Sequence, residues 1–354
     1  MGIKTTYWTV SADQPEPEII QRAAEIIING GLVAFPTETV YGLGADGTNP
    51  QAVRRIFAAK GRPSDNPLIL HVACKDEVLG LATEVNAQAR QLMQLFWPGP
   101  LTLVLPKKPC VPEEVTAGLD TVAIRMPRHP VALALIAASG VPIAAPSANL
   151  SGYPSPTTGR HVYEDLAGRI EAVLDSGETG VGLESTVLDL SGPIPVILRP
   201  GGVTREELTA VLGTVIVDQG LSDPRQKPKA PGMKYVHYSP RAEVVLIHGP
   251  REQNALKIRE LVTAYADKGK KIGLLLTRET WRHLPDLKGQ VAYAQDLGSC
   301  ARLEEIAHLL YRELRNCDEA RADVVFTETY PEEGIGAALM NRLLKAAGYK
   351  VIDS

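Results

Sequence analysis

The chain alternates apolar stretches of strand length with segments of helical periodicity along almost its whole length. In residues 17–31, for example, isoleucines and alanines recur at helical spacing before a pair of glycines ends the helix. A strand-length stretch, 32–36, follows at once, and the next helix, 51–61, again ends on a glycine. Alternation of this kind predicts an α/β fold.

Residues 219–242 interrupt the alternation with four prolines, several cations and few apolar side chains. This composition is typical of a linker. We therefore expect a first domain over 1–218, with a mixed α/β sheet that ends in a hairpin of 185–190 and 195–200. A smaller, Rossmann-like doubly wound α/β domain is expected over 243–354, where strand and helix patterns resume.

Composition excludes several classes of protein. The chain has 354 residues, enough for about two domains, and its 37 basic and 41 acidic residues give a net charge of −4, unlike a polycation that coats nucleic acid. None of its apolar runs approaches the ~20 residues that span a bilayer. No secretory signal is recognisable at the N-terminus. The four cysteines form no CxxC pair, so we expect reduced thiols and a cytoplasmic protein without a membrane partner.

Polar side chains gather in residues 36–71, which contain PTETVYGLG and, after a helix, KGRPSDNPLILH. They are Thr37, Thr39, Lys60, Arg62, Ser64, Asn66 and His71. Hydroxyls and cations between apolar strands suit a phosphate-bearing ligand, because a charge-assisted hydrogen bond is roughly twice as strong as a neutral one. The alternatives are a solvated basic loop over 61–67 and a satisfied structural histidine on the strand 68–73.

A second polar set lies further along the chain. Period-two alternation in 121–127 places Thr121 and Arg125 on one face, opposite an apolar face, so we expect Arg125 to line a cleft. An arginine and a threonine on one face suit a carboxylate or a phosphate, although an arginine at a sheet edge can also simply reach water. The remaining candidates sit in loops or beside the hairpin, where turn, cap or exposed positions are the ordinary alternative: Ser147, Asn149, Ser151, Ser155, Ser185 and Arg199.

Several familiar nucleotide-binding, metal-binding and catalytic motifs are missing from the sequence. The sequence contains no GxxxxGK[ST] phosphate loop, no HExxH, no HxE with CxxC and no set of kinase motifs. The glycines of GLGADG, residues 42–47, lack the spacing of a dinucleotide-binding fingerprint, and we expect them to lead into a loop. A magnesium or nucleotide site therefore cannot be assigned from these motifs.

Taken together, the motifs resemble one family. They appear in a fixed order: PTETVYGLGAD, KGRPSDNPLILH, FWPGPLT, VAIRMPRHP, APSANLSGYPSPT, ESTVLDL with ILRPGG, and PGMKYVHYSP. This set is similar to threonylcarbamoyl-AMP synthases of the long form, in which a YrdC-like domain with a concave cleft is followed by a smaller C-terminal domain. The motifs cover about residues 20–240, and the C-terminal part resembles the family by its position and α/β pattern.

The resemblance implies an ATP-dependent enzyme that joins L-threonine, bicarbonate or CO₂, and ATP into threonylcarbamoyl-AMP and releases pyrophosphate. Magnesium is expected on the triphosphate. The partners implied are proteins that transfer the threonylcarbamoyl group to adenosine 37 of tRNAs reading ANN codons; direct tRNA binding is left open.

The resemblance also implies site residues. Those expected around L-threonine are Thr39, His71, Arg125, Ala145 and Ser185. Those expected to hold ATP are Lys60, Arg62, Asn66, Thr121, Ser147, Ser155, Arg199 and Tyr235. Among them, the cations Lys60, Arg62 and Arg199 are the catalytic candidates, because they can offset charge that develops at the α-phosphate. No general base stands out.

The linker gains a role from this assignment. We hypothesise that 219–242 folds as a lid over the active site and excludes water from a hydrolysable intermediate.

Two other functions compete with this interpretation. One is an RNA-binding module, although aromatic residues are only 5% of the chain and none lies within the basic loop. The other is a different ATP-using transferase, such as a carbamoyltransferase-like enzyme. Dependence of pyrophosphate release on both threonine and bicarbonate distinguishes the synthase from both.

Overall fold

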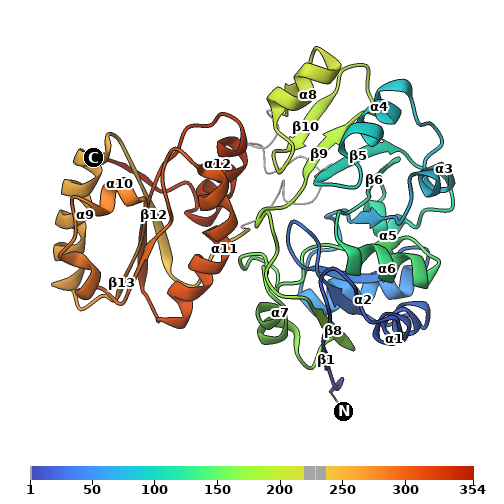
Figure 1. Ribbon diagram of the computed structural model, residues 1–354, viewed down its shortest axis with the longest axis horizontal. Coiled ribbons are helices and arrows are strands. Elements are labelled where there is room, and N and C mark those ends of the chain that lie inside the picture. Colours follow the sequence, from blue (N-terminus) through green and yellow to red (C-terminus); the bar gives the residue numbers. More distant parts are fainter. Residues whose placement is uncertain (1, 219–227, 229–236) are drawn as a thin grey trace. The chain divides into compact units, whose positions relative to one another are not determined.

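The computed structural model describes residues 2–218, 228 and 237–354 (Figure 1). The chain forms two compact units, one of Met1–Ser151 with Ser155–Tyr235 and one of Gly152–Pro154 with Val236–Ser354. Most of the predicted lid, 219–227 and 229–236, lies outside the described residues, and so does Tyr235.

One mixed sheet organises the first unit. In sequence order its strands are β1 Thr6–Thr9, β2 Val33–Phe35, β3 Gly42–Asp46, β4 Ile69–His71, β5 Leu101–Pro106, β6 Thr121–Arg125, β7 Ile143–Ala144, β8 Ala172–Asp175, β9 Thr186–Asp189, β10 Val196–Arg199 and β11 Ile216–Val217. Within the described residues they pair in the order β1-β8-β2-β3-β7-β4-β6-β5-β9-β10-β11. The predicted hairpin is present as the antiparallel pair β9–β10.

Helices cover both faces of this sheet. They are α1 Pro17–Ile28, α2 Pro50–Lys60, α3 Val78–Leu81, α4 Ala87–Phe96, α5 Glu113–Thr116, α6 Pro130–Ser139, α7 Gly159–Leu166 and α8 Arg205–Leu212. Helices α1 and α6 bury residues such as Ile27 and Leu135 against Val33 and Phe35 of β2. Helices α2, α4, α7 and α8 contribute to the larger core cluster on the other face, which contains Ala34.

The local sequence fixes the ends of α2, the helix that leads into the predicted basic loop. Asn49 caps its first turn by accepting hydrogen bonds from the backbone N–H groups of Gln51 and Ala52. Gly61 ends it in the left-handed conformation, with φ of 62°, which a glycine adopts without steric cost. Lys60 and Arg62 are thereby placed on either side of a fixed reversal of the chain.

Strand β3 was not anticipated from the sequence, although the loop expected after GLGADG is present as the short loop 47–49. The strand pairs antiparallel with both β2 and β7. The missing signal is an apolar alternation, because two of its five residues are glycines. The packing requires them: a Cβ on Gly44 would stand 2.8 Å from both Ile143 Cγ2 and Phe35 Cε1. Strands β1 and β8 were also not anticipated.

The second unit is a parallel sheet with helices on both faces. Its strands are β12 Glu243–His248, β13 Ile272–Leu276, β14 Tyr293–Asp296, β15 Val324–Glu328 and β16 Val351–Asp353. They pair in the order β14-β13-β15-β12-β16. Helices α9 Arg251–Ala266 and α10 Arg278–Trp281 lie on one face, and α11 Leu303–Glu319 and α12 Ile335–Ala346 lie on the other (Figure 1). This is the doubly wound arrangement expected from the alternating pattern.

Two further findings concern membrane-spanning helices and the cysteines. In the part of the chain that the structure describes, no helix combines the length and the apolar character needed to cross a bilayer. The four cysteines, Cys74, Cys110, Cys300 and Cys317, are all unpaired.

The close approach at Gly44 generates a first prediction. Gly44→Ala places a methyl group against Phe35 and Ile143, and overpacking of this kind costs about 1–3 kcal/mol. We expect the free energy of unfolding, measured with urea, to fall by that amount. Gly80→Ala is the matched control, because nothing lies within 4 Å of its added Cβ. Equal urea midpoints for Gly44→Ala and wild type would contradict this account of the strand.

Candidate active site

The guanidinium of Arg125, at the end of β6, is the centre of the first polar group. The residue is only 4% exposed. Its Nε donates to Gly99 O at 3.2 Å, its Nη1 donates to Thr39 Oγ1 at 3.0 Å, and its Nη2 forms an ion pair with Glu38 Oε1 at 2.8 Å. The arginine expected to line a cleft is therefore nearly enclosed by polar partners from two distant segments.

A short hydroxyl chain orients Thr39. The Thr37 hydroxyl donates to Val40 O at 2.7 Å, and Thr37 Oγ1 lies 2.8 Å from Thr39 Oγ1. Because Thr37 has one hydroxyl proton and gives it to the backbone, Thr39 donates to Thr37 and accepts from Arg125. The PTET motif thus presents fixed hydroxyl groups beside a cation.

His71 lies beside Arg125 because β4 and β6 are parallel neighbours, with these two residues in register. Its imidazole packs edge-on against Phe35, with ring centroids 6.2 Å apart. Burial, together with the positive charge of Arg125, lowers the pKa of His71 to about 3. Its Nδ1 has no hydrogen-bond partner among the described residues. A neutral imidazole with a vacant polar atom can take a hydrogen bond from a small ligand.

Ser185, just before β9, and Arg199, at the end of β10, form a second group. Arg199 donates to Ser185 O from Nε at 3.1 Å and from Nη2 at 3.0 Å. The Ser185 hydroxyl lies 2.8 Å from that of Thr102 on β5. Since β5 pairs with β6 on one side and β9 on the other, this group continues along the sheet from Arg125. Ala145, the remaining predicted threonine contact, follows β7 and donates its N–H to Ile69 O of β4 at 2.9 Å.

Lys60 connects two of the predicted ATP-binding segments. Its ammonium donates to Ser147 O and Asn149 O, each at 2.5 Å, and Ser151 N donates to Lys60 O at 2.9 Å. The side chain is 2% exposed. The last residue of α2 therefore holds the hydroxyl-rich loop that follows β7.

The basic loop after α2 is anchored by Arg62, whose Nη2 donates to Pro67 O at 3.2 Å. Asn66 in this loop is fully buried, and neither atom of its side-chain amide has a partner among the described residues. A buried, unsatisfied amide is costly, so it is a strong candidate for a ligand contact. Thr121, at the start of β6, is four residues from Arg125, or about 13 Å along a strand.

Ser155 donates to Glu184 Oε1 at 2.5 Å, in a buried pair that joins the loop after β7 to the segment before β9. Glu38, Thr102 and Glu184 were not predicted as site residues. Each lies in or beside one of the motifs identified in the sequence. Their pairing with residues in distant segments, however, leaves no recognisable pattern in a single sequence.

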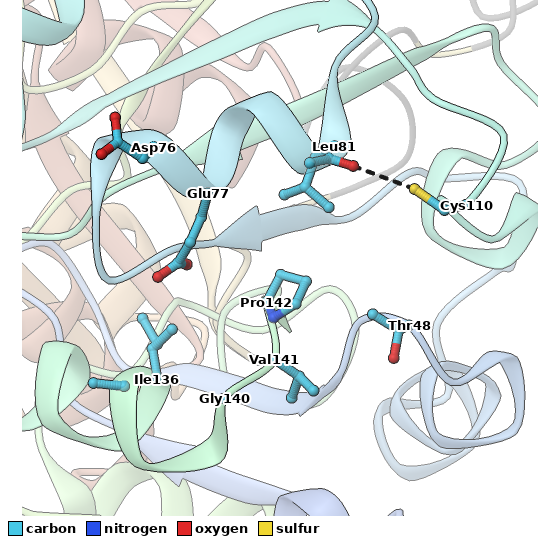
Figure 2. Close-up of a pocket in the computed structure, with 11 residues that line it drawn as sticks. Thr48, Asp76, Glu77, Leu81, Cys110, Ile136, Gly140, Val141 and Pro142 are labelled. Atoms are coloured by element: carbon cyan, nitrogen blue, oxygen red, sulfur yellow. Dashed lines mark hydrogen bonds between the residues drawn. The ribbon is translucent and has the colours of Figure 1, made fainter.

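The pocket drawn in Figure 2 is a different feature. Its walls are mainly apolar, including Leu81, Ile136 and Val141, and its ionisable carboxyls are Asp76 and Glu77. None of the residues predicted to bind substrate lines it, nor does any lysine or arginine among the described residues. An acidic, apolar pocket does not suit a triphosphate, so we do not assign it to the reaction.

The polar groups of the first unit can therefore hold two kinds of ligand. Arg125 with Thr39, His71 and Ser185 suits a small molecule with a carboxylate and a hydroxyl group. The loops that carry Lys60, Arg62 and Ser147 suit phosphate groups. The fold and this site together define an α/β protein built to bring an amino acid against a phosphorylated compound.

Comparison with known proteins identifies the family. A model described as telomere recombination matches residues 25–201, and a model described as threonylcarbamoyl-AMP synthase, C-terminal domain, matches residues 203–348. The chain is 50% identical over 358 residues to the threonylcarbamoyl-AMP synthase of Bacillus subtilis (strain 168), covering 99% of this chain and 100% of that protein. It is 42% identical over 361 residues to that of Schizosaccharomyces pombe, covering 93% and 88%.

A solved structure agrees with these matches. The crystal structure of Pyrococcus abyssi Sua5 complexed with L-threonine aligns with a TM-score of 0.93 and 48% sequence identity, covering 99% of this chain and 100% of that one. The chain therefore belongs to the threonylcarbamoyl-AMP synthase family, in its long, two-domain form. The family, the fold class and the enzymatic class expected from the motifs are confirmed.

The electrostatics of His71 generate the second prediction. Unfolded histidine has a pKa near 6.5 and His71 a pKa of about 3, so between these values only the unfolded chain binds the proton. The free energy of unfolding therefore rises with pH across this window, and the contribution is lost as pH falls. Between pH 6.5 and 4.5, wild type should lose more stability than His71→Gln, measured by urea unfolding.

Nitrogen NMR of the imidazole provides the independent check. The ring of His71 should stay neutral at pH 5, well above its pKa of about 3. A His71 titration near pH 6.5 would contradict the burial and the position of Arg125.

Proposed function

We propose that this chain joins L-threonine, CO₂ supplied as bicarbonate, and ATP into threonylcarbamoyl-AMP, with release of pyrophosphate. The single observation that supports these substrates best is the buried guanidinium of Arg125, which presents a carboxylate-binding fork beside the Thr39 hydroxyl and a neutral His71. The P. abyssi protein, of the same family, has been solved with L-threonine. A threonine carboxylate on Arg125 would leave its hydroxyl group for neutral polar partners such as His71 or Ser185.

The chemistry needs a carbamate to attack the α-phosphorus of ATP, one anion approaching another. Cations placed beside the phosphates offset that repulsion, and most of the rate acceleration comes from positioning and this compensation. Arg62 and Arg199 supply guanidinium groups for the phosphates. Lys60 contributes through the loop of Ser147 and Asn149, whose backbone it holds in place.

Magnesium enters with ATP as the MgATP complex. Mg²⁺ is commonly held by substrate phosphates with one or two carboxylates and several waters. A cationic loop bearing Arg62 beside few carboxylates fits a metal carried mainly by the nucleotide. When bound, the ion neutralises charge on the departing pyrophosphate.

The product is a mixed anhydride that water destroys, so other proteins must accept it promptly. We assign those partners to the class that transfers the threonylcarbamoyl group to adenosine 37 of tRNAs reading ANN codons, forming N6-threonylcarbamoyladenosine. This assignment places the enzyme in the cytoplasm, where tRNA and reduced thiols are found.

The decisive assay measures pyrophosphate release from ATP with each of the twenty amino acids, with and without bicarbonate. We expect release only when threonine and bicarbonate are both present. Release with threonine alone would indicate simple amino-acid adenylation. Salt-sensitive RNA binding without ATP turnover would instead favour an RNA-binding module.

The cations generate a mutational prediction. Arg62→Ala removes a preorganised donor, and removing one such donor typically costs 10²–10³ in rate. We expect kcat/KM for ATP to fall by that factor while threonine binding, measured by calorimetry, stays within about threefold. The matched control is Arg160→Ala, an exposed arginine paired with Glu164, which should leave turnover unchanged. If the Arg62→Ala enzyme kept the wild-type kcat/KM for ATP, the assignment of Arg62 to the phosphate site would be wrong.

A further inference from the structure

The carboxylate of Glu38 is buried without the hydrogen bonds that a buried carboxylate usually accepts. The residue is 7% exposed. Its Oε1 stands 2.8 Å from Arg125 Nη2 as an ion pair, and neither oxygen accepts a hydrogen bond from the described residues. A charged acceptor this deeply buried normally has several donors. Its remaining acceptor capacity is therefore available to a ligand.

Backbone hydrogen bonds from a neighbouring segment hold the residue that carries this carboxylate. Val181 N donates to Glu38 O at 2.7 Å, and Gly182 N donates to Thr39 O at 3.1 Å. Backbone hydrogen bonds from 181–182 thus hold the PTET segment in place. The side chains of Glu38 and Thr39 contact the guanidinium of Arg125 in the absence of a substrate.

The covalent geometry of an amino acid places its ammonium group near Glu38. Two of the five N–H groups of Arg125 donate to Gly99 and Thr39, and Nη2 stands at ion-pair distance from Glu38, so at least two N–H groups remain for a substrate carboxylate. The α-nitrogen of that substrate is only two bonds, of about 1.5 Å each, from its carboxylate carbon. Of the described groups that contact Arg125, only Glu38 is an anion, so it attracts the ammonium.

The other titratable groups nearby are poor proton acceptors. His71 has a pKa of about 3 because it is buried beside Arg125. His129 caps α6 by accepting from Val131 N at Nδ1, and burial lowers its pKa, although the charge of Glu38 opposes that shift. Neither imidazole is matched to an ammonium proton as well as a carboxylate at ion-pair distance.

We propose that Glu38 is the general base that deprotonates the threonine ammonium, a step that rests on the proposed function. The N–H bond breaks, its electron pair stays on nitrogen, and the proton moves to Glu38 Oε2. The nitrogen lone pair then forms a bond to the carbon of CO₂, and one C–O π pair moves to oxygen. The second nitrogen proton passes to water, which leaves the carbamate anion, and Glu38 later returns its own proton to water.

The amino acid itself aligns the base with its proton. Among the described residues, the ion-pair partner of Glu38 is Arg125. A threonine carboxylate bound to the same guanidinium places its own ammonium group beside Glu38, so the substrate and the base share one cation.

The test compares Glu38→Gln with wild type by pyrophosphate release across pH 7–9. General base catalysis contributes about 10²–10⁴ in rate, so kcat at pH 7 should fall at least 100-fold. Below the pKa of the free amine, the neutral fraction rises tenfold per pH unit. With dissolved CO₂ held at the same concentration at each pH, the rate of the variant should therefore climb steeply toward pH 9, while the wild-type profile stays flatter. Glu164→Gln, an exposed glutamate, is the matched control.

Two outcomes overturn the proposal: a Gln variant within threefold of wild type at pH 7, or the same fold-loss at every pH, which a role in holding Arg125 alone would produce. Glu38→Asp guards against misfolding, because it keeps the charge beside Arg125. It should be slower than wild type yet keep the wild-type pH profile, and an Asp profile as steep as that of Gln contradicts the assignment. Wild-type enzyme that releases no pyrophosphate with threonine and bicarbonate refutes the proposed function instead.

Discussion

A guanidinium buried with incomplete compensation would be strongly destabilising, and the site depends on how Arg125 avoids this. Removing one partner of a buried ion pair typically costs 3–5 kcal/mol. Glu38, Thr39 and Gly99 supply that compensation from two segments that precede β6 by many residues. These contacts use only some of the N–H groups of the guanidinium. Arg125 therefore joins distant segments of the protein and still has donors for a substrate carboxylate. Burial, together with the charge of Arg125, lowers the pKa of His71 and keeps it neutral.

Lys60 has the corresponding role for the phosphate side. An ammonium that donates to two backbone carbonyls at the end of α2 fixes the loop after β7 relative to the loop that carries Arg62 and Asn66. Sequence reasoning treats Lys60 as a direct ATP contact, but the structure adds a second task. Loss of this lysine would release the Ser147 loop as well as remove a positive charge, so its effect on rate would combine both causes.

Periodicity accounts for what the sequence could predict. Helices such as α2, with an Asn cap and a terminal glycine, and strands such as β6 carry signals within a few residues. Strand β3 carries none, because two of its five residues are glycines, and at Gly44 the close approach of Phe35 and Ile143 leaves no room for a side chain. The pairings Glu38–Arg125 and Ser155–Glu184 depend on which strands become neighbours, and one sequence does not encode that in any local pattern. The order of the motifs in the sequence was enough to predict the family. The partners of the buried charged residues became visible only in the folded structure.

The arrangement separates two kinds of selectivity. Every amino acid carries the carboxylate and ammonium that Arg125 and Glu38 would engage, so these residues favour amino acids over other compounds without distinguishing side chains. A site that can hydrogen-bond a substrate hydroxyl rejects an analogue without one far more strongly than an apolar pocket rejects a missing methylene. The groups proposed for that task are the buried Nδ1 of His71, which has no partner among the described residues, and the Ser185 hydroxyl. In the proposed mechanism, discrimination for threonine over valine would rest on His71 of β4 and Ser185, just before β9, and activation of the amine would rest on Glu38.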